Sequence, residues 1–170
     1  MAGEKLILTG FMGMGKSTVG RRSAELLGLP YNDTDDWMEA NAGIDIPQLV
    51  RTDMVKFRGL EAATLQTIVG ETSGVVSTGG GIVTTEVGRR ALLATDTPVL
   101  WLRAPFEVAE RRVMQDTGRE RPLFNDVTKA RALYKERMVW YEETASHIVD
   151  ASRPLELVAD QVVEIARSQA

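Results

Sequence analysis

The fold is decided by residues 10–17, which read Gly10-Phe11-Met12-Gly13-Met14-Gly15-Lys16-Ser17. This stretch matches the pattern G-x-x-x-x-G-K-[ST] at every fixed position, and Thr18 follows it. Glycines at these positions let the backbone wrap with its N–H groups pointing inward, where they can bind phosphate oxygens. A helix that begins at Lys16 adds unpaired N–H groups and the positive end of its dipole. The pattern therefore predicts a nucleotide-phosphate loop, with Lys16 on the β- and γ-phosphates and Ser17 on Mg²⁺.

The segments around this loop predict an α/β fold. An apolar run over residues 6–9 precedes it and is typical of a buried strand, and residues 16–27 read as a helix that stops at Gly28. Further along the chain, short β-branched runs alternate with amphipathic stretches, which indicates a parallel sheet covered by helices. We expect further strands at 31–33, 75–77, 98–102 and 147–149, and further helices at 37–42, 46–52, 55–68, 86–94, 127–141 and 155–166, with one more starting at Pro105.

Composition narrows the class of protein. The chain has 170 residues, of which 44% are hydrophobic and 26% charged, as in an ordinary single globular domain. A net charge of −4 argues against a nucleic-acid surface. The absence of cysteine excludes disulfides, thiolate zinc sites and cysteine nucleophiles, and His147 alone leaves no histidine pair for a metal. No apolar run is long enough to span a bilayer and the N-terminus does not read as a signal peptide, so we expect one cytoplasmic domain over residues 1–170.

An acidic pair, Asp33 and Asp35, follows the second predicted strand. This is the edge at which open α/β sheets bind ligands. Alternate residues of an extended segment point in opposite directions, so one carboxylate could face Mg²⁺ and phosphate while the other faces an incoming hydroxyl. The alternative is that aspartate here only caps a helix N-terminus.

Arg58 and Glu61 are three residues apart on a predicted helix, where their side chains can pair. Such a pair on the surface would contribute under about 1 kcal/mol. A guanidinium held by Glu61 could instead grip a substrate carboxylate through two hydrogen bonds. The pattern alone leaves both interpretations open.

Three consecutive glycines, Gly79 to Gly81, follow the third predicted strand and indicate a close approach of the backbone or a tight turn. Residues 116–125 are polar and contain Arg119 and Arg121, which predicts a mobile surface loop. Phosphoryl transfer needs cations over the moving group, so an arginine of this loop could close over ATP, although both arginines could equally be solvated. Arg137 has no assigned role on pattern alone.

Taken together, these motifs resemble the shikimate kinase family over nearly the whole chain. The resemblance implies a P-loop NTPase fold like that of the nucleoside monophosphate kinases, with a five-stranded parallel sheet flanked by helices. It also implies a substrate-binding region at about 33–61 and a lid loop at about 116–125. The implied reaction transfers the γ-phosphoryl group of ATP to the 3-hydroxyl of shikimate, with ATP and Mg²⁺ as cofactors. We expect a monomer without nucleic-acid or membrane partners.

The resemblance also assigns residue roles. The residues it implies for catalysis are Asp35, as the base that holds the shikimate hydroxyls, Lys16, and Arg121 of the lid. Those for the nucleotide are Gly13, Met14, Gly15, Lys16, Ser17, Thr18, Arg112, Arg121, Arg153 and Pro154. Those for shikimate are Asp35, Arg58, Glu61, Gly79, Gly80, Gly81 and Arg137, with both arginines on the carboxylate. Those for Mg²⁺ are Ser17 and Asp33, the latter through water.

The sequence departs from the family pattern in two places. Residues 54–56, Met-Val-Lys, stand where the family usually has a glycine and acidic residues, and the segment is one residue shorter. The lid is slightly longer than in many members, so Arg119 could share the role of Arg121. Two other functions remain as alternatives, a related kinase such as a gluconate kinase and a ligand-binding sensor without turnover.

Overall fold

The computed structural model describes residues 5–71, 73–116 and 122–169. Its centre is a parallel sheet of five strands in the order β2-β3-β1-β4-β5. The strands are β1 (Lys5–Thr9), β2 (Tyr31–Asp33), β3 (Gly74–Ser77), β4 (Val99–Arg103) and β5 (His147–Asp150). The predicted α/β class with a five-stranded parallel sheet is confirmed.

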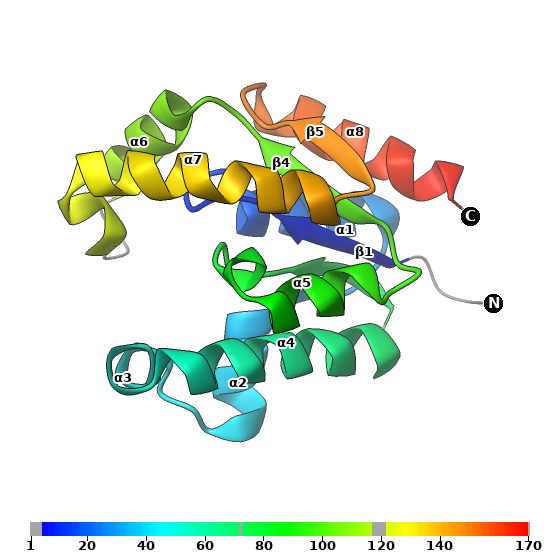
Figure 1. Ribbon diagram of the computed structural model, residues 1–170. Helices are drawn as coiled ribbons and strands as arrows, with labels where there is room; N and C mark the ends of the chain where they lie inside the picture. The colour runs from blue at the N-terminus through cyan, green and yellow to red at the C-terminus, as the bar shows by residue number, and fades with distance from the viewer. Residues whose placement is uncertain (1–4, 72, 117–121, 170) are drawn as a thin grey trace.

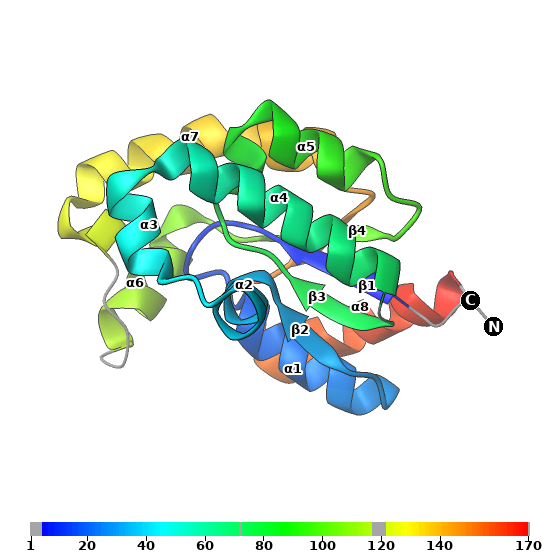
Figure 2. The same ribbon diagram turned by 90° about the horizontal axis from the view of Figure 1, so that it is seen from below.

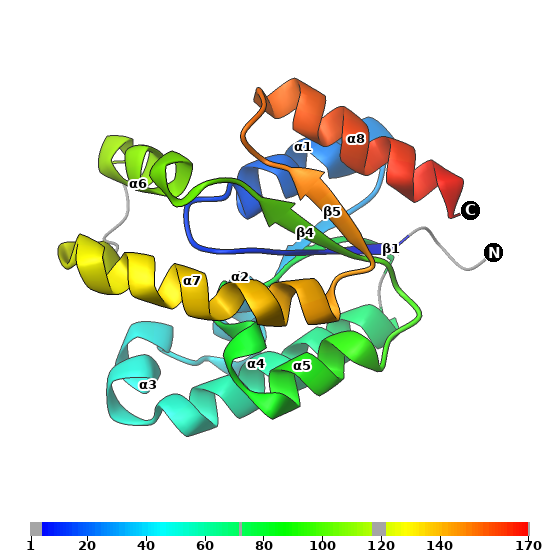
Figure 3. The same cartoon turned by 45° about the horizontal axis from the view of Figure 1, so that its top comes forward.

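Helices cover both faces of the sheet (Figures 1 and 3). On one face lie α1 (Lys16–Leu27) and α8 (Leu155–Ser168), and on the other lie α4 (Met54–Glu71), α5 (Glu86–Leu93) and α7 (Val127–Thr144). Two short helices, α2 (Thr34–Ala42) and α3 (Ile46–Thr52), lie beside the first turns of α4 (Figure 2). The remaining elements are α6 (Phe106–Gln115) and the 3₁₀ turns η1 (Ile82–Thr84) and η2 (Pro122–Asn125).

The central strand explains why the sheet forms where it does. Leu6, Ile7 and Leu8 of β1 are almost completely buried, because helices cover both faces of a parallel sheet. β1 lies between β3 and β4. The strands that follow it first in the chain, β2 and β3, lie on one side of β1, and the later strands, β4 and β5, lie on the other. Ligands of open α/β sheets bind beyond the carboxyl ends of the strands at such a reversal of order. The loop after β1 is the phosphate loop predicted from the sequence.

Several predicted boundaries differ from the structure by one to three residues; for example, the helix predicted to start at Pro105 begins at Phe106, with Pro105 as its cap residue. Two of the differences have a clear physical reason. Helix α2 begins at Thr34 and not at residue 37, because the Asp33 side chain caps it by accepting a hydrogen bond from the Asp35 N–H. Asp35 therefore lies in the first turn of a helix and not in an extended segment. Strand β4 begins at Val99, since Pro98 has no N–H and joins the sheet only through its carbonyl, which accepts from Ile7.

Within the described parts of the chain, no helix combines the length and the apolar character that crossing a bilayer would need.

Candidate active site

The loop between β1 and α1 has a backbone that glycine makes possible. Gly13 has φ 81°, in the left-handed region, and a Cβ atom at this position would lie 2.9 Å from the carbonyl oxygen of Ala109. The Lys16 side chain folds back over the loop, and its Nζ donates to Gly10 O at 2.7 Å and to Phe11 O at 3.1 Å. The structure thus brings the predicted lysine to the mouth of the loop, at the N-terminus of α1.

The other residues of the loop contribute in different ways. The Met14 side chain is buried in the core, so only its backbone can face a phosphate. Thr18 is exposed on α1. Arg112 of α6 donates to the carbonyl of Ala151 at 2.8 Å, and its Nη1 would be 3.9 Å from a Cβ at Gly15. This contact places Arg112 beside the phosphate loop, on the same side as the turn that precedes α8.

Asp33 accepts three hydrogen bonds in this site. Ser17 Oγ donates to its Oδ2 at 3.3 Å, the Tyr31 hydroxyl donates to the same atom at 3.1 Å, and the Asp35 N–H donates to Oδ1 at 3.0 Å. Burial, as the main cause, raises the pKa of Tyr31 to about 12, so the phenol remains a donor. Tyr31 was not predicted as a site residue, although its position two residues before Asp33 on a strand puts both side chains on one face.

Ser17 and Asp33 fit a magnesium ion. A hydroxyl and a carboxylate oxygen are hard donors, and Mg²⁺ commonly takes one or two such protein groups while phosphates and water complete its shell. Among the described residues, no group of three or more His, Cys, Asp or Glu side chains could hold a metal by itself. A magnesium ion at this position would therefore depend on the oxygens of a bound nucleotide.

Asp35 and Glu61 are two further carboxylates of the site, and both approach Gly79. Asp35 Oδ1 and Glu61 Oε1 are buried and have no hydrogen-bond partner among the described residues. Burial, followed by the negative charges of Glu61 and Asp33, raises the pKa of Asp35 to about 7. Burial also raises the pKa of Glu61, while the Arg58 guanidinium opposes that shift. A carboxyl with a pKa near neutrality, next to a loop for phosphate, is suited to accept a proton from a hydroxyl.

Arg58 and Glu61 form a buried ion pair and not a surface one. Arg58 Nη1 lies 2.7 Å from Glu61 Oε2, and the side chains are 15% and 0% exposed. The pair lies against the triple glycine: a Cβ at Gly79 would overlap Glu61 Oε1, and a Cβ at Gly81 would overlap the Arg58 guanidinium. The sequence left the role of this pair open, and its burial favours a guanidinium held in place for a ligand.

Arg137 reaches the same glycines from α7. Its Nη1 donates to Gly80 O at 3.3 Å, and its buried Nε has no partner among the described residues. Gly80 also contacts the phosphate loop, since a Cβ here would lie 3.1 Å from Gly10 O and 3.3 Å from Met12 N. The triple glycine is therefore the element at which both predicted ends of the site meet.

Apart from Gly13, Met14, Gly15, Thr18 and Arg112, which are described above, the predicted residues divide into three groups. Those that converge around the loop and the triple glycine are Lys16, Ser17, Asp33, Asp35, Arg58, Glu61, Gly79, Gly80, Gly81 and Arg137. Arg153 is exposed, and Pro154 precedes α8 as its cap residue. Arg119 and Arg121 lie outside the described residues.

Comparison with known proteins identifies the family. A family model described as shikimate kinase matches residues 12–167. The chain belongs to the shikimate kinase family. A curated shikimate kinase of Streptococcus suis is 37% identical over 161 residues, which are 92% of this chain and 94% of that protein. Shikimate kinase membership identifies the chain as an ATP-dependent kinase that acts on shikimate, as the sequence predicted.

Solved structures agree with this assignment. The shikimate kinase from Acinetobacter baumannii in complex with shikimate superimposes with a TM-score of 0.85 at 31% identity, covering 98% of this chain and 94% of that one. A gluconokinase from Sinorhizobium meliloti superimposes with a TM-score of 0.65 at 18% identity, covering 98% and 93%. The second likeness is one of fold alone, so the shikimate kinase family and not the related gluconate kinase is the match.

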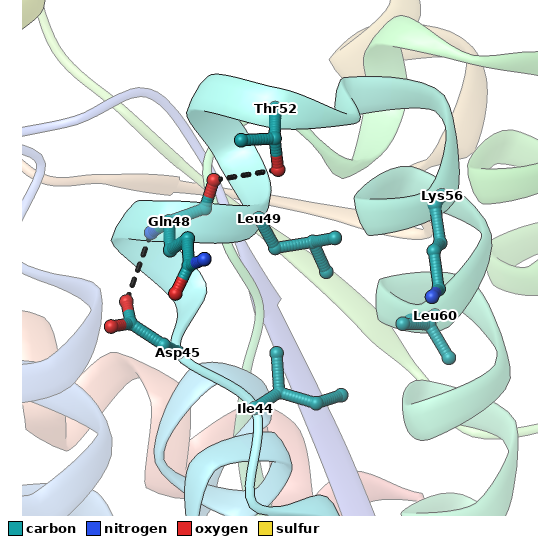
Figure 4. Close-up of a pocket in the computed structure, with 7 residues that line it drawn as sticks. All are labelled: Ile44, Asp45, Gln48, Leu49, Thr52, Lys56 and Leu60. Carbon is teal, nitrogen blue, oxygen red and sulfur yellow. Dashed lines mark hydrogen bonds between the residues drawn. The ribbon is translucent and has the colours of Figure 1, made fainter.

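A cavity of about 410 Å³ lies elsewhere in this shikimate kinase-like fold, between α3 and the start of α4 (Figure 4). Its lining residues are Ile44, Asp45, Gln48, Leu49, Thr52, Lys56 and Leu60. Within it, Asp45 caps α3 by accepting from the Gln48 N–H at 2.9 Å, and Thr52 donates to Gln48 O at 2.9 Å. All seven residues lie within the predicted substrate-binding region at about 33–61, although none of them was predicted individually as a site residue.

Proposed function

We propose that the phosphate loop and the triple glycine form the two halves of one active site, in which the γ-phosphoryl group of ATP passes to the 3-hydroxyl of shikimate. One observation carries the proposal: Asp35, Glu61 and the arginines Arg58 and Arg137 surround Gly79–Gly81, directly beside the loop that begins at Gly10. Shikimate is an anionic polyol, and this arrangement offers an acid for its hydroxyls and guanidinium groups for its carboxylate.

At the nucleotide end, the N–H groups of the loop and of the first turn of α1 bind phosphate oxygens. Lys16 leaves the loop carbonyls on which it rests and neutralises the β- and γ-phosphates. Ser17 and Asp33 would hold Mg²⁺, and the ion would supply positive charge beside the phosphates. Arg112, Arg153 and Pro154 flank the base. The family resemblance assigns the phosphates also to Arg121, which lies outside the described residues.

At the shikimate end, Arg58 and Arg137 bind the carboxylate and Glu61 holds Arg58 in place. Asp35 binds the reacting hydroxyl and accepts its proton. Phosphoryl transfer with a loose transition state asks little of a base, so orientation by Asp35 matters more than its proton affinity. The backbone of Gly79–Gly81 closes this end of the site. We propose further that the single domain acts as a monomer in the cytoplasm.

The test is a coupled assay of ADP formation with shikimate or gluconate as acceptor, followed by ³¹P NMR of the product. We expect turnover with shikimate, a phosphate ester at its 3-hydroxyl and no turnover with gluconate. Lys16→Met is the control for the nucleotide end and should abolish turnover with either acceptor. Activity on gluconate without activity on shikimate would reject the proposal.

A further inference from the structure

Tyr141 contacts the triple glycine from the interior of the protein. It lies four residues after Arg137 on α7, so the two side chains share one face of the helix. The Tyr141 side chain is fully buried and stacks on Trp101 of β4, with ring centroids 5.8 Å apart and an angle of 22° between the planes. Its hydroxyl donates to the carbonyl oxygen of Gly80 at 2.5 Å.

One carbonyl oxygen therefore receives two donors. Gly80 O accepts from Tyr141 at 2.5 Å and from Arg137 Nη1 at 3.3 Å. Because Nη1 is turned toward Gly80, this carbonyl constrains the orientation of the guanidinium, whose buried Nε has no partner among the described residues. The position of the Gly80 carbonyl thus helps to determine how Arg137 presents its remaining donors.

The same carbonyl fixes the direction of a peptide N–H. The described chain has no cis peptide bonds, and in a trans peptide the C=O of Gly80 and the N–H of Gly81 point in opposite directions. With the carbonyl held against Tyr141, the Gly81 N–H points away from α7. Arg58 lies against Gly81, so a carboxylate bound by Arg58 would be next to this donor.

We propose that Tyr141 is a positioning residue for the carboxylate end of the substrate, acting through the Gly80 carbonyl on the Arg137 guanidinium and on the Gly81 N–H. The inference rests on the proposed function, because it assumes that Arg58 and Arg137 bind the shikimate carboxylate. Burial raises the pKa of the Tyr141 phenol far above its ordinary value, against the lowering effect of Arg137, so the hydroxyl remains a donor at any working pH. A rigid ring packed on Trp101 holds this donor at little cost in entropy.

The chain offers a control for the loss of a phenol hydroxyl that donates to a main-chain carbonyl. Tyr134 lies on the same helix, and its hydroxyl donates to the carbonyl of Ala104 at 2.7 Å. Tyr134→Phe removes a hydrogen bond of the same type from a partly buried side chain, so it should lose no more thermal stability than Tyr141→Phe. Only Tyr141→Phe removes a bond to the triple glycine.

The first experiment measures steady-state kinetics of the wild type and of both variants, with each substrate varied in turn. We expect Tyr141→Phe to raise the KM for shikimate roughly five- to tenfold, as the loss of one buried hydrogen bond would. The KM for ATP and kcat should be unchanged, and Tyr134→Phe should change none of the three. An unchanged KM for shikimate in Tyr141→Phe, or an equal rise for ATP, would overturn the inference.

The second experiment asks whether Tyr141 acts through Arg137. Direct binding of shikimate is measured by calorimetry for Tyr141→Phe, Arg137→Ala and the double variant. If Tyr141 acts mainly by placing the guanidinium, the second substitution should weaken binding less in the Arg137→Ala background than in the wild type. Full additivity of the two effects would overturn the coupling.

A third test uses the wild-type protein, so it does not depend on whether a variant folds. In a crystal structure with shikimate, the Tyr141 hydroxyl should still donate to Gly80 O while the Gly81 N–H faces the substrate carboxylate. A Gly80–Gly81 peptide turned away from Tyr141 in that complex would overturn the inference. Failure of the wild type to phosphorylate shikimate would instead reject the proposed function, so the two failures are distinguishable.

Discussion

Asp35 and Glu61 belong to two different helices, yet each turns a carboxylate oxygen toward Gly79. A Cβ at Gly79 would lie 3.6 Å from Asp35 Oδ1 and would overlap Glu61 Oε1. The two carboxylates repel one another, which is the second cause, after burial, of the raised pKa of Asp35. The absence of a side chain at residue 79 thus allows Glu61 to pair with Arg58 while Asp35 remains close to the phosphate loop.

We expect Gly79→Ala to displace Glu61, to misplace Arg58 and to weaken shikimate binding. Overpacking of this kind should also lower the free energy of unfolding by about 1–3 kcal/mol. Calorimetric titration with shikimate and urea denaturation measure the two effects. Gly70→Ala is the control, because a Cβ at this helical position meets nothing within 4 Å, and it should slightly stabilise the protein. Tight shikimate binding by Gly79→Ala would contradict this account of the contact.

The stability of the protein should depend on pH through Asp35. Its pKa is about 7 in the folded protein against an ordinary value of 3.8, so between these pH values the folded state keeps a proton that the unfolded state releases. This contribution to stability is complete below pH 3.8 and is lost as the pH rises toward 7. The free energy of unfolding of Asp35→Asn, relative to that of the wild type, should therefore rise by up to about 4 kcal/mol over this pH range and stay constant at higher pH. Urea denaturation at a series of pH values tests this, and a constant difference would contradict it.

The activity should follow the same group. A base must be ionised to accept a proton, so kcat/KM for shikimate should rise as the pH increases through about 7 and reach a plateau above it. Asp35→Asn should lose most turnover but still bind ATP, since the phosphate loop is unchanged. A near-normal rate in this variant would refute the role of Asp35.

The buried pair of Arg58 and Glu61 predicts an asymmetric response to substitution. Arg58→Met leaves the Glu61 carboxylate buried without its partner, which should cost about 3–5 kcal/mol of stability. Adding Glu61→Gln removes the stranded charge and should recover much of this loss, without restoring shikimate binding. Urea denaturation and calorimetry separate the two results. Equal stability of the single and double variants would show that the pair is not desolvated as the structure indicates.

Ser17 gives a prediction about the metal. Ser17→Ala removes a proposed magnesium ligand and should weaken ADP binding in the presence of Mg²⁺ by roughly tenfold or more. Binding of ADP in the presence of a chelator should be unaffected. Ser23→Ala, on the same helix, is the control, because the buried Ser23 hydroxyl has no partner among the described residues. An equal loss with and without Mg²⁺ would argue against the metal role of Ser17.

Local sequence patterns predicted the fold well, and the reason is physical. The phosphate loop, the apolar strand before it and the helix after it are adjacent in the chain, so their residue types alone determine them. The start of α2 was wrong because aspartates at 33, 35 and 36 all suit a helix cap, and only the final geometry selects Asp33.

Contacts between distant segments could not be predicted in the same way. The burial of the Arg58–Glu61 pair depends on Gly79–Gly81, which comes much later in the chain. Tyr141 was missed because its partner Gly80 is 61 residues away. Its spacing from Arg137 is a signal that both side chains share a helix face, but that spacing does not reveal what they contact.

The contact of Gly80 with the phosphate loop has a consequence for the distance between the γ-phosphoryl group and the hydroxyl that accepts it. A Cβ at Gly80 would lie 3.1 Å from Gly10 O and 3.3 Å from Met12 N, so the triple glycine packs directly against the main chain of the phosphate loop. An in-line displacement begins when nucleophile and electrophile are about 3–3.5 Å apart. A methyl group at residue 80 would push the triple glycine away from the phosphate loop, and so would lengthen the distance between the acceptor and the donor that these two segments are proposed to hold.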